Sequence, residues 1–127
     1  AFLVFADEII QSAHNHFGNL SSISLWGFSQ GGAASLVYTL FGSQKIFKAA
    51  SVCGFLPELP SINIDEASPA QILGVYGQND EVVPSFLADY ALEEMKNKGH
   101  QVQVKETSQP HELNSENLLD VYTFFNS

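Results

Sequence analysis

Apolar residues recur along this chain at two spacings, which alternate from one end to the other. A spacing of three to four residues is typical of a helix with one buried face. Short apolar runs, or strict alternation of apolar and polar residues, are typical of strands. The pattern therefore predicts, in order, helix 2–17, strand 23–26, helix 32–41, strand 49–53, strand 72–76, a helix beginning near 85, strand 102–105 and a helix beginning near 115.

Polar and glycine residues mark the expected ends of these helices. Gly18 and Gly42 stand where the first two helical patterns stop. Ser85 and Asn114 are residue types that cap helix starts, so we expect them to be the N-caps of the last two helices. The expected buried stripes of those helices are Ala88, Ala91, Leu92 and Met95, followed by Leu118, Val121, Tyr122 and Phe125.

One long stretch has no regular spacing. Residues 55–70 contain Pro57, Pro60 and Pro69 and follow neither period, which predicts a loop. Loops of this length in compact domains are often functional.

The alternation of helices and strands predicts an α/β fold with a mainly parallel sheet and helices on both faces. The length of 127 residues fits a single domain. Four parallel strands form a narrow sheet, and the pattern opens directly within a helix. We therefore expect residues 1–127 to be the C-terminal portion of a larger α/β unit whose native start precedes Ala1.

Composition limits the partners. Five Lys and Arg against fourteen Asp and Glu give a net charge of −9, which opposes binding to nucleic acid and to anionic membranes. No apolar run approaches the roughly 20 residues of a membrane span. The single cysteine, Cys53, excludes an internal disulfide and favours a reducing compartment, so a cytoplasmic location is expected.

The segment Gly27-Phe28-Ser29-Gln30-Gly31 lies where a predicted strand gives way to a predicted helix. It matches Gly-x-Ser-x-Gly, in which the serine occupies a strained turn and the glycines let strand and helix approach each other. Such a serine projects at the carboxyl end of the sheet, where open α/β folds place their sites. The alternative interpretation of the motif is an ordinary tight turn.

A serine hydroxyl becomes a good nucleophile only beside a base, and the base needs a carboxylate to orient it. Asp80 follows the predicted strand 72–76, and His111 follows the predicted strand 102–105. Taken singly, Asp80 fits a surface turn and His111 fits a solvent-exposed loop. Together with Ser29 they follow the order Ser, Asp, His at three strand ends on one sheet edge, which predicts a catalytic triad.

The segments "GFSQGGAASL", "CGFLP", "GQNDEVVP" and "HEL" resemble the carboxylesterase and acyl-protein thioesterase branch of the α/β-hydrolases. On this resemblance, 1–127 is the C-terminal portion of a single α/β-hydrolase domain. The resemblance implies that Ser29 is the nucleophile, that His111 is the general base and that Asp80 orients the histidine. It also implies that the backbone N–H of Gln30 is an oxyanion donor and that Leu56 and Val83 line the acyl pocket.

Two features depart from that family. Pro110 stands before the histidine, where a small residue is usual, and proline either fixes or misplaces His111. The second oxyanion donor normally comes from a glycine-rich loop after an early strand, which would precede Ala1. Either the chain is a fragment of a longer hydrolase or a second chain completes it, and a homodimer is one such arrangement.

We therefore expect a serine hydrolase acting on carboxylic esters or thioesters, either small molecules or acylated proteins. The alternative is a hydrolase-like binding module without activity, or a fragment that needs a missing N-terminal part. Transfer of the acyl group to an acceptor other than water is a third option. We expect no metal and no cofactor: Cys53 fits core packing, and His100, at the start of a predicted strand, fits simple exposure.

Overall fold

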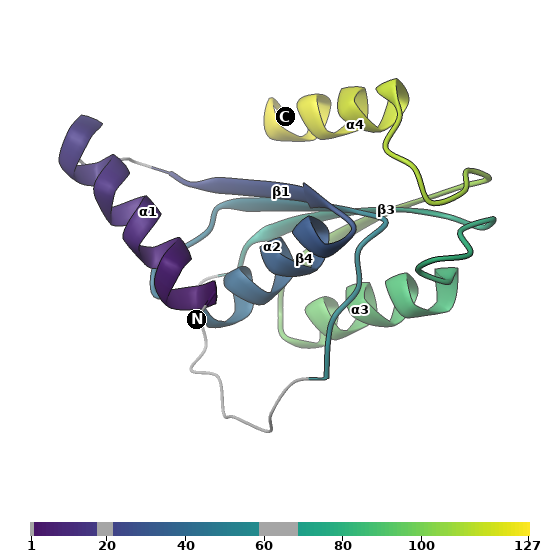
Figure 1. Ribbon diagram of the computed structural model, residues 1–127, viewed down its shortest axis with the longest axis horizontal. Coiled ribbons are helices and arrows are strands. Elements are labelled where there is room, and N and C mark those ends of the chain that lie inside the picture. Colours follow the sequence, from purple (N-terminus) through teal and green to yellow (C-terminus); the bar gives the residue numbers. More distant parts are fainter. Residues whose placement is uncertain (1, 18–21, 59–68) are drawn as a thin grey trace.

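The computed structural model describes residues 2–17, 22–58 and 69–127, over which helices and strands alternate (Figure 1). Every predicted element is present, with its ends within two residues of the expected positions; Gly18, the expected stop of the first helix, lies outside the described residues. The elements are α1 (Phe2–Phe17), β1 (Ser24–Phe28), α2 (Gln30–Phe41), β2 (Lys48–Val52), β3 (Gln71–Gly77), α3 (Ser85–Asn97), β4 (Gln101–Thr107) and α4 (Ser115–Phe125).

All four strands are parallel and pair in chain order, β1-β2-β3-β4. Every residue of β2 is buried, as expected of an inner strand with both faces covered. The alternation predicted for β4 is only partly confirmed, because Val102 is half-buried but Val104 is 51% exposed and Lys105 is half-buried. As an edge strand of the described sheet, β4 has no fully buried residue on either face. Because the strands are parallel, their carboxyl ends lie along a single edge of the sheet.

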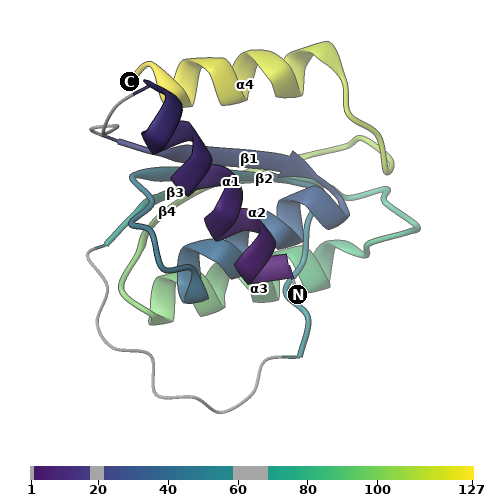
Figure 2. The ribbon, with the colours of Figure 1, turned by 60° about the vertical axis from the view of Figure 1, so that its left-hand side comes forward.

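Helices cover both faces of the sheet, which confirms the predicted fold class. In Figures 1 and 2, α2 and α3 lie on one face and α4 lies on the other. Alternate residues of β3 supply the two cores: Ile72 and Tyr76 join the cluster that includes α2 and α3, and Leu73 and Val75 join the cluster that includes α4. Among the described helices, none has the length and apolar content that crossing a membrane requires.

The two predicted helix caps have different outcomes. The prediction that Ser85 caps α3 is wrong, because Ser85 is the first helical residue and the cap position belongs to Pro84, whose carbonyl accepts the N–H of Leu87 at 2.9 Å. The predicted cap of α4 is confirmed. The side chain of Asn114 accepts the N–H of Asn117 at 2.8 Å, and the side chain of Asn117 accepts the N–H of Asn114 at 3.2 Å.

The buried stripe of α3 is as predicted, but that of α4 is partly wrong. Leu118 and Tyr122 are 46% and 67% exposed, whereas the fully buried positions are Asn117, Val121 and Phe124. Phe125 is half-buried against the core. The helix is turned so that a polar side chain, Asn117, faces inward from its first turn, and apolar periodicity alone does not predict that orientation.

The expectation that His100 is exposed is also wrong. His100 is 8% exposed, and its Nδ1 accepts the N–H of Ala70 at 3.0 Å. The reason is the start of the parallel pairing, where the N–H of Gln101 donates to the carbonyl of Ala70 at 3.1 Å and brings the two segments together.

The predicted loop over 55–70 has no helix or strand in its described residues. Residues 59–68, which include Pro60, lie outside the described residues.

A buried lysine holds the far end of α4. The ammonium of Lys48, which is 2% exposed at the start of β2, donates to the carbonyls of Phe124 at 2.7 Å and Ser127 at 2.9 Å. Its Nζ also lies 5.2 Å from the centroid of the Phe124 ring. A cation at a helix C-terminus is favourable, because it donates to the last carbonyls and lies at the negative end of the helix dipole.

Candidate active site

Ser29 lies between the last residue of β1 and the first residue of α2. Its φ of 57° and ψ of −116° are unusual for a residue with a side chain. The turn is held from both sides, because the N–H of Ser29 donates to the carbonyl of Val52 at 2.9 Å and its carbonyl accepts the N–H of Ala33 at 3.0 Å. The predicted strained corner is therefore present at the carboxyl edge of the sheet.

The glycines of the motif do not share one role. A Cβ on Gly27 would lie 2.2 Å from the backbone carbon of Gly31, so strand and helix touch there and only glycine fits. A Cβ on Gly31 would meet no described atom within 4 Å, so the expectation that both flanking glycines are required for close approach is wrong at Gly31. Gly32 has that role instead, since its Cβ would lie 2.6 Å from Oγ of Ser51.

Asp80 lies in the turn that follows β3, and its side chain is 1% exposed. One carboxylate oxygen accepts the N–H groups of Val82 at 2.9 Å and Val83 at 2.8 Å. The other oxygen lies 2.7 Å from Nδ1 of His111. Burial by itself raises the pKa of the Asp80 carboxyl, but the hydrogen bonds from His111, Val83 and Val82 outweigh it and hold that pKa below its ordinary value.

His111 joins the other two side chains. Its Nδ1 lies 2.7 Å from Oδ2 of Asp80, and its Nε2 lies 3.0 Å from Oγ of Ser29. Because an ionised carboxylate only accepts hydrogen bonds, Nδ1 carries the proton and Nε2 is free to accept the serine hydroxyl. Pro110 does not displace the histidine from this position. The ring of Phe28 packs against the imidazole with centroids 4.9 Å apart.

Cys53 lies beside Asp80 and His111. It is fully buried, in agreement with the predicted core role. Burial, and then the neighbouring Asp80 carboxylate, raise the pKa of the Cys53 thiol to about 11. The ligand atoms of Cys53, Asp80 and His111 lie within 4.8 Å of one another. A protonated thiol and a 2.7 Å carboxylate–imidazole contact favour hydrogen bonding in this group over ligation of a cation.

Gln30 is the first residue of α2, directly after Ser29. The first N–H groups of a helix have no acceptor within the helix, and they lie at the positive end of its dipole. The backbone N–H of Gln30 is therefore one of these groups, and its role as an oxyanion donor stays a prediction.

The side chains of the two predicted pocket residues take no part in the hydrogen bonds among Asp80, His111 and Ser29. Leu56 is half-buried and packs against the larger core cluster. Val83 is 7% exposed, and its N–H is bonded to Asp80. Their contact with a substrate stays a prediction.

Three residues in or beside the candidate site, Phe28, Gln109 and Asn117, are not predicted from the sequence. Phe28 packs on the imidazole, and the signal available was its place inside the motif beside Ser29. Gln109, within the His111 loop, and Asn117, in α4, are both buried. Only the Asn114–Asn117 spacing of a capping box pointed to Asn117, and nothing distinguished Gln109 from a solvated loop residue.

The fold of this chain is similar to those of solved structures. A structure of Arabidopsis thaliana SOBER1 superposes with a TM-score of 0.86 at 23% identity, covering 98% of this chain and 61% of that one. The Bacillus cereus carboxylesterase gives a TM-score of 0.84 at 14% identity, with 98% and 60% covered. YahD with malic acid gives 0.82 at 21% identity, with 96% and 59% covered. This chain thus spans about three-fifths of the length of each.

The sequence itself is matched by a family model. No curated protein sequence matches the chain. The model described as phospholipase/carboxylesterase, however, matches residues 6–127, which is nearly the whole chain. Together with the parallel sheet and its structural likenesses, this match confirms the resemblance seen in the motifs. The chain belongs to the phospholipase/carboxylesterase family of α/β-hydrolases.

Proposed function

We propose that this chain carries the catalytic triad of a serine hydrolase that cleaves carboxylic esters or thioesters. The observation that supports this proposal is the continuous run of contacts from Asp80 through His111 to Ser29, with 2.7 Å and 3.0 Å between the paired atoms. The three side chains come from the ends of β3, β4 and β1. Hydroxyl, imidazole and buried carboxylate in this order is the arrangement that activates a serine for attack on an acyl carbon.

In the first half of the proposed reaction, Oγ of Ser29 attacks the acyl carbon while Nε2 of His111 takes the hydroxyl proton. The carbonyl π electrons move to oxygen, and the backbone N–H of Gln30 donates to that oxyanion. When the oxyanion collapses, the bond to the alcohol or thiol breaks, and the leaving group takes the proton from Nε2. Asp80 stabilises the transient imidazolium and holds its tautomer.

In the second half, a water molecule attacks the acyl-serine ester. Nε2 of His111 accepts a proton from this water, and after collapse of the second oxyanion it returns the proton to Oγ of Ser29. The carboxylic acid leaves, and the enzyme is restored. The family description and the B. cereus carboxylesterase likeness support an ester as the bond cleaved. If the acyl group is transferred to another acceptor, that acceptor replaces water in this second half, and the first half is unchanged.

Covalent labelling tests the nucleophile. We expect a fluorophosphonate probe to modify Ser29 in the full-length protein, with the label found on the peptide that contains it by mass spectrometry. Ser29→Ala should abolish labelling and lower kcat for p-nitrophenyl acetate by roughly 10⁴- to 10⁶-fold. A matched control, Ser43→Ala, removes an exposed hydroxyl elsewhere and should leave both unchanged. Labelling that persists in Ser29→Ala would contradict the assignment.

A comparison of lengths tests the competing interpretation. The rate of p-nitrophenyl acetate turnover by the full-length protein is compared with that of residues 1–127 alone. Turnover by the longer chain only would indicate that a second oxyanion donor outside this segment is required, since one donor is worth about 10²- to 10³-fold in kcat. Turnover by neither would favour a binding module without activity.

A further inference from the structure

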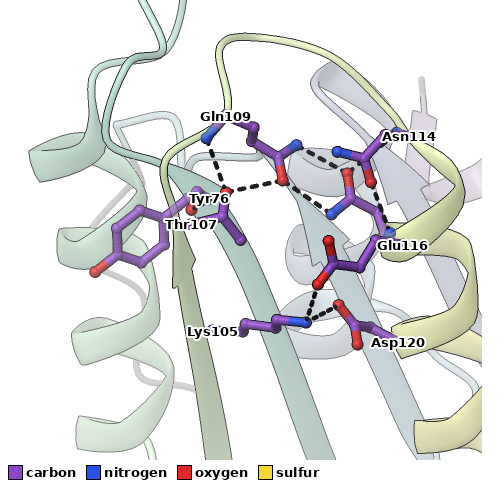
Figure 3. Close-up of polar contacts among 8 residues, drawn as sticks. Tyr76, Lys105, Thr107, Gln109, Asn114, Glu116 and Asp120 are labelled. Carbon is purple, nitrogen blue, oxygen red and sulfur yellow. Dashed lines mark hydrogen bonds and ion pairs between the residues drawn. The ribbon is translucent and has the colours of Figure 1, made fainter.

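Two buried amide side chains face each other beneath the loop that carries His111. Gln109 lies in this loop, between β4 and α4, and is 8% exposed; Asn117 lies in the first turn of α4 and is 1% exposed. Nε2 of Gln109 donates to Oδ1 of Asn117 at 2.8 Å, and Nδ2 of Asn117 donates to Oε1 of Gln109 at 3.0 Å. Figure 3 shows Gln109 in this network, beside Thr107 and Asn114. We call these two residues the amide pair.

Each oxygen of the amide pair also accepts a second hydrogen bond. The hydroxyl of Thr107 donates to Oε1 of Gln109 at 2.8 Å, and the N–H of Asn114 donates to Oδ1 of Asn117 at 3.2 Å. Among the described residues, no buried side-chain nitrogen or oxygen lacks a partner. A network that is satisfied at every atom has one geometry, because any rotation would leave a buried polar group unpaired.

The amide pair is joined to both sides of His111. Gln109 precedes the histidine by two residues, and its Nε2 also donates to the carbonyl of Glu112, the residue that follows the histidine, at 2.8 Å. Within this bridge the N–H of Glu112 donates to the carbonyl of Pro110 at 2.9 Å, which makes a three-residue turn with His111 at its centre.

The same loop is held against the end of β3. The carbonyl of Gln109 accepts the N–H of Asn79 at 3.3 Å, directly before Asp80 in the chain. A Cβ on Gly77 would lie 1.9 Å from that carbonyl oxygen, so glycine permits the close approach. The loop of the imidazole and the turn of its carboxylate partner are thus in direct contact.

We propose that the amide pair is a positioning device that sets the distances from His111 to Asp80 and to Ser29; this proposal rests on the proposed triad. Part of the pair's role is stability, because Oδ1 of Asn117 also accepts the N–H of Asn114 in the cap of α4 and Nε2 of Gln109 also donates to the carbonyl of Glu112. For the bonds between the two amides themselves stability is a weaker explanation, since replacing both partners of a buried hydrogen bond with apolar groups of similar shape is nearly neutral. What two reciprocal, directional bonds add is a fixed register between the His111 loop and α4.

The central test is Asn117→Leu in the full-length protein, a change that keeps a side chain branched at Cγ and removes its hydrogen bonds. We expect kcat for p-nitrophenyl acetate to fall about 10²-fold, as a displacement of roughly 1 Å can produce, while KM changes little. The second readout is the far-downfield proton NMR resonance of the His111–Asp80 hydrogen bond, assigned by its absence from His111→Gln. That resonance should be lost or shifted upfield in Asn117→Leu.

Two further variants separate positioning from folding. Gln109→Met/Asn117→Leu replaces the whole pair by apolar side chains; its unfolding free energy should recover relative to Asn117→Leu, while kcat and the resonance should not. Lys48→Met releases the opposite end of α4, where Lys48 bonds the carbonyls of Phe124 and Ser127. It should lower stability but leave kcat and the resonance as in the wild type. If Asn117→Leu fails to fold, the kcat and the NMR resonance of the double variant test the proposal instead.

The outcomes for the two proposals differ. If the wild type shows no turnover with any ester or thioester tested, the proposed function fails, and the NMR resonance alone still tests positioning. If the wild type is active but the variants of the amide pair retain its kcat and its resonance, positioning is overturned while the function stands. A wild type without the downfield resonance also overturns it.

Discussion

Among the residues that the structure describes, two with side chains, Ser29 and Cys53, have a positive φ, of 57° and 52°. Each directly follows a strand, and each is bonded through its N–H to the next strand, Ser29 to Val52 and Cys53 to Val75. Backbone conformations of this kind cost on the order of 1–3 kcal/mol per residue and persist only where the surroundings determine them. At Ser29 the result is a hydroxyl that projects from the sheet edge toward His111.

The close contact behind this turn is open to mutation. In Gly27→Ala the new methyl group would overlap the backbone of Gly31, so we expect the free energy of unfolding to fall by roughly 1–3 kcal/mol, measured by chemical denaturation. Gly31→Ala is the matched control. Its methyl group meets no described atom, and its stability should stay the same or rise by up to about 1 kcal/mol. Equal losses in both variants would contradict this account.

Under the proposed function, Asp80 fixes the tautomer of the His111 imidazole. In Asp80→Asn the amide can donate to Nδ1, which would move the ring proton to Nε2 and remove the base that the proposed nucleophile, Ser29, needs. We expect kcat to fall about 10⁴-fold with little change in KM. Asp89→Asn, at an exposed carboxylate on α3, is the control and should retain the wild-type kcat. A similar kcat in Asp80→Asn and wild type would remove Asp80 from the triad.

The elements differ in how far the sequence predicts them. The inner strands and the stripe of α3 follow from periodicity alone, because their environment is uniformly apolar. The face of α4 does not, because Asn117 points inward and leaves Leu118 and Tyr122 in solvent. A hydrophobicity pattern assigns polar side chains to the surface, so it misses an amide whose partner lies elsewhere in the chain.

The residues of the candidate site also differ in how far the sequence predicts them. Ser29, Asp80 and His111 each follow a strand, so chain order and parallel topology place them at one edge of the sheet. Gln109 and Asn117 depend on a pairing between a loop and a helix that no spacing rule encodes.

The junction of β3 and β4 should make stability depend on pH. Burial lowers the pKa of His100 below its ordinary value of 6.5, and its Nδ1 accepts the N–H of Ala70 only when unprotonated. The unfolded chain therefore binds this proton at higher pH than the folded chain, and stability is lost as pH falls below about 6.5. We expect the unfolding free energies of wild type and His100→Gln, measured between pH 8 and pH 5, to converge or cross on acidification. A constant difference would exclude His100 as the cause.

At the scale of the whole molecule, the sheet separates two cores and aligns its strand ends on one edge. The three side chains of the proposed triad come from three of these four ends, and α4, on the opposite face from α2 and α3, supplies the Asn117 amide that bonds Gln109 in the His111 loop. The chain spans about three-fifths of the length of the solved structures that share this fold.

Under the proposed function, the net charge of −9 on these 127 residues should affect which esters reach the site. At low ionic strength we expect kcat/KM for acetylthiocholine, a cationic thioester, to exceed that of an uncharged thioester of the same shape by about tenfold, because the negative field of the protein attracts the cation. Added salt should reduce this ratio, since 1 M salt shortens the screening length to about 3 Å. A ratio that is independent of salt would indicate that local contacts set the preference.

The residues of the triad are far apart in sequence, His111 being 82 positions from Ser29 and 31 from Asp80. Under the proposed function, a chain that is still being synthesised, or that has only its first strands in place, displays a serine with no more reactivity than any other. The serine becomes reactive only once α4 has packed on the sheet and the His111 loop is in place. The fraction of molecules that a serine-directed probe labels would therefore report the fraction that is correctly folded.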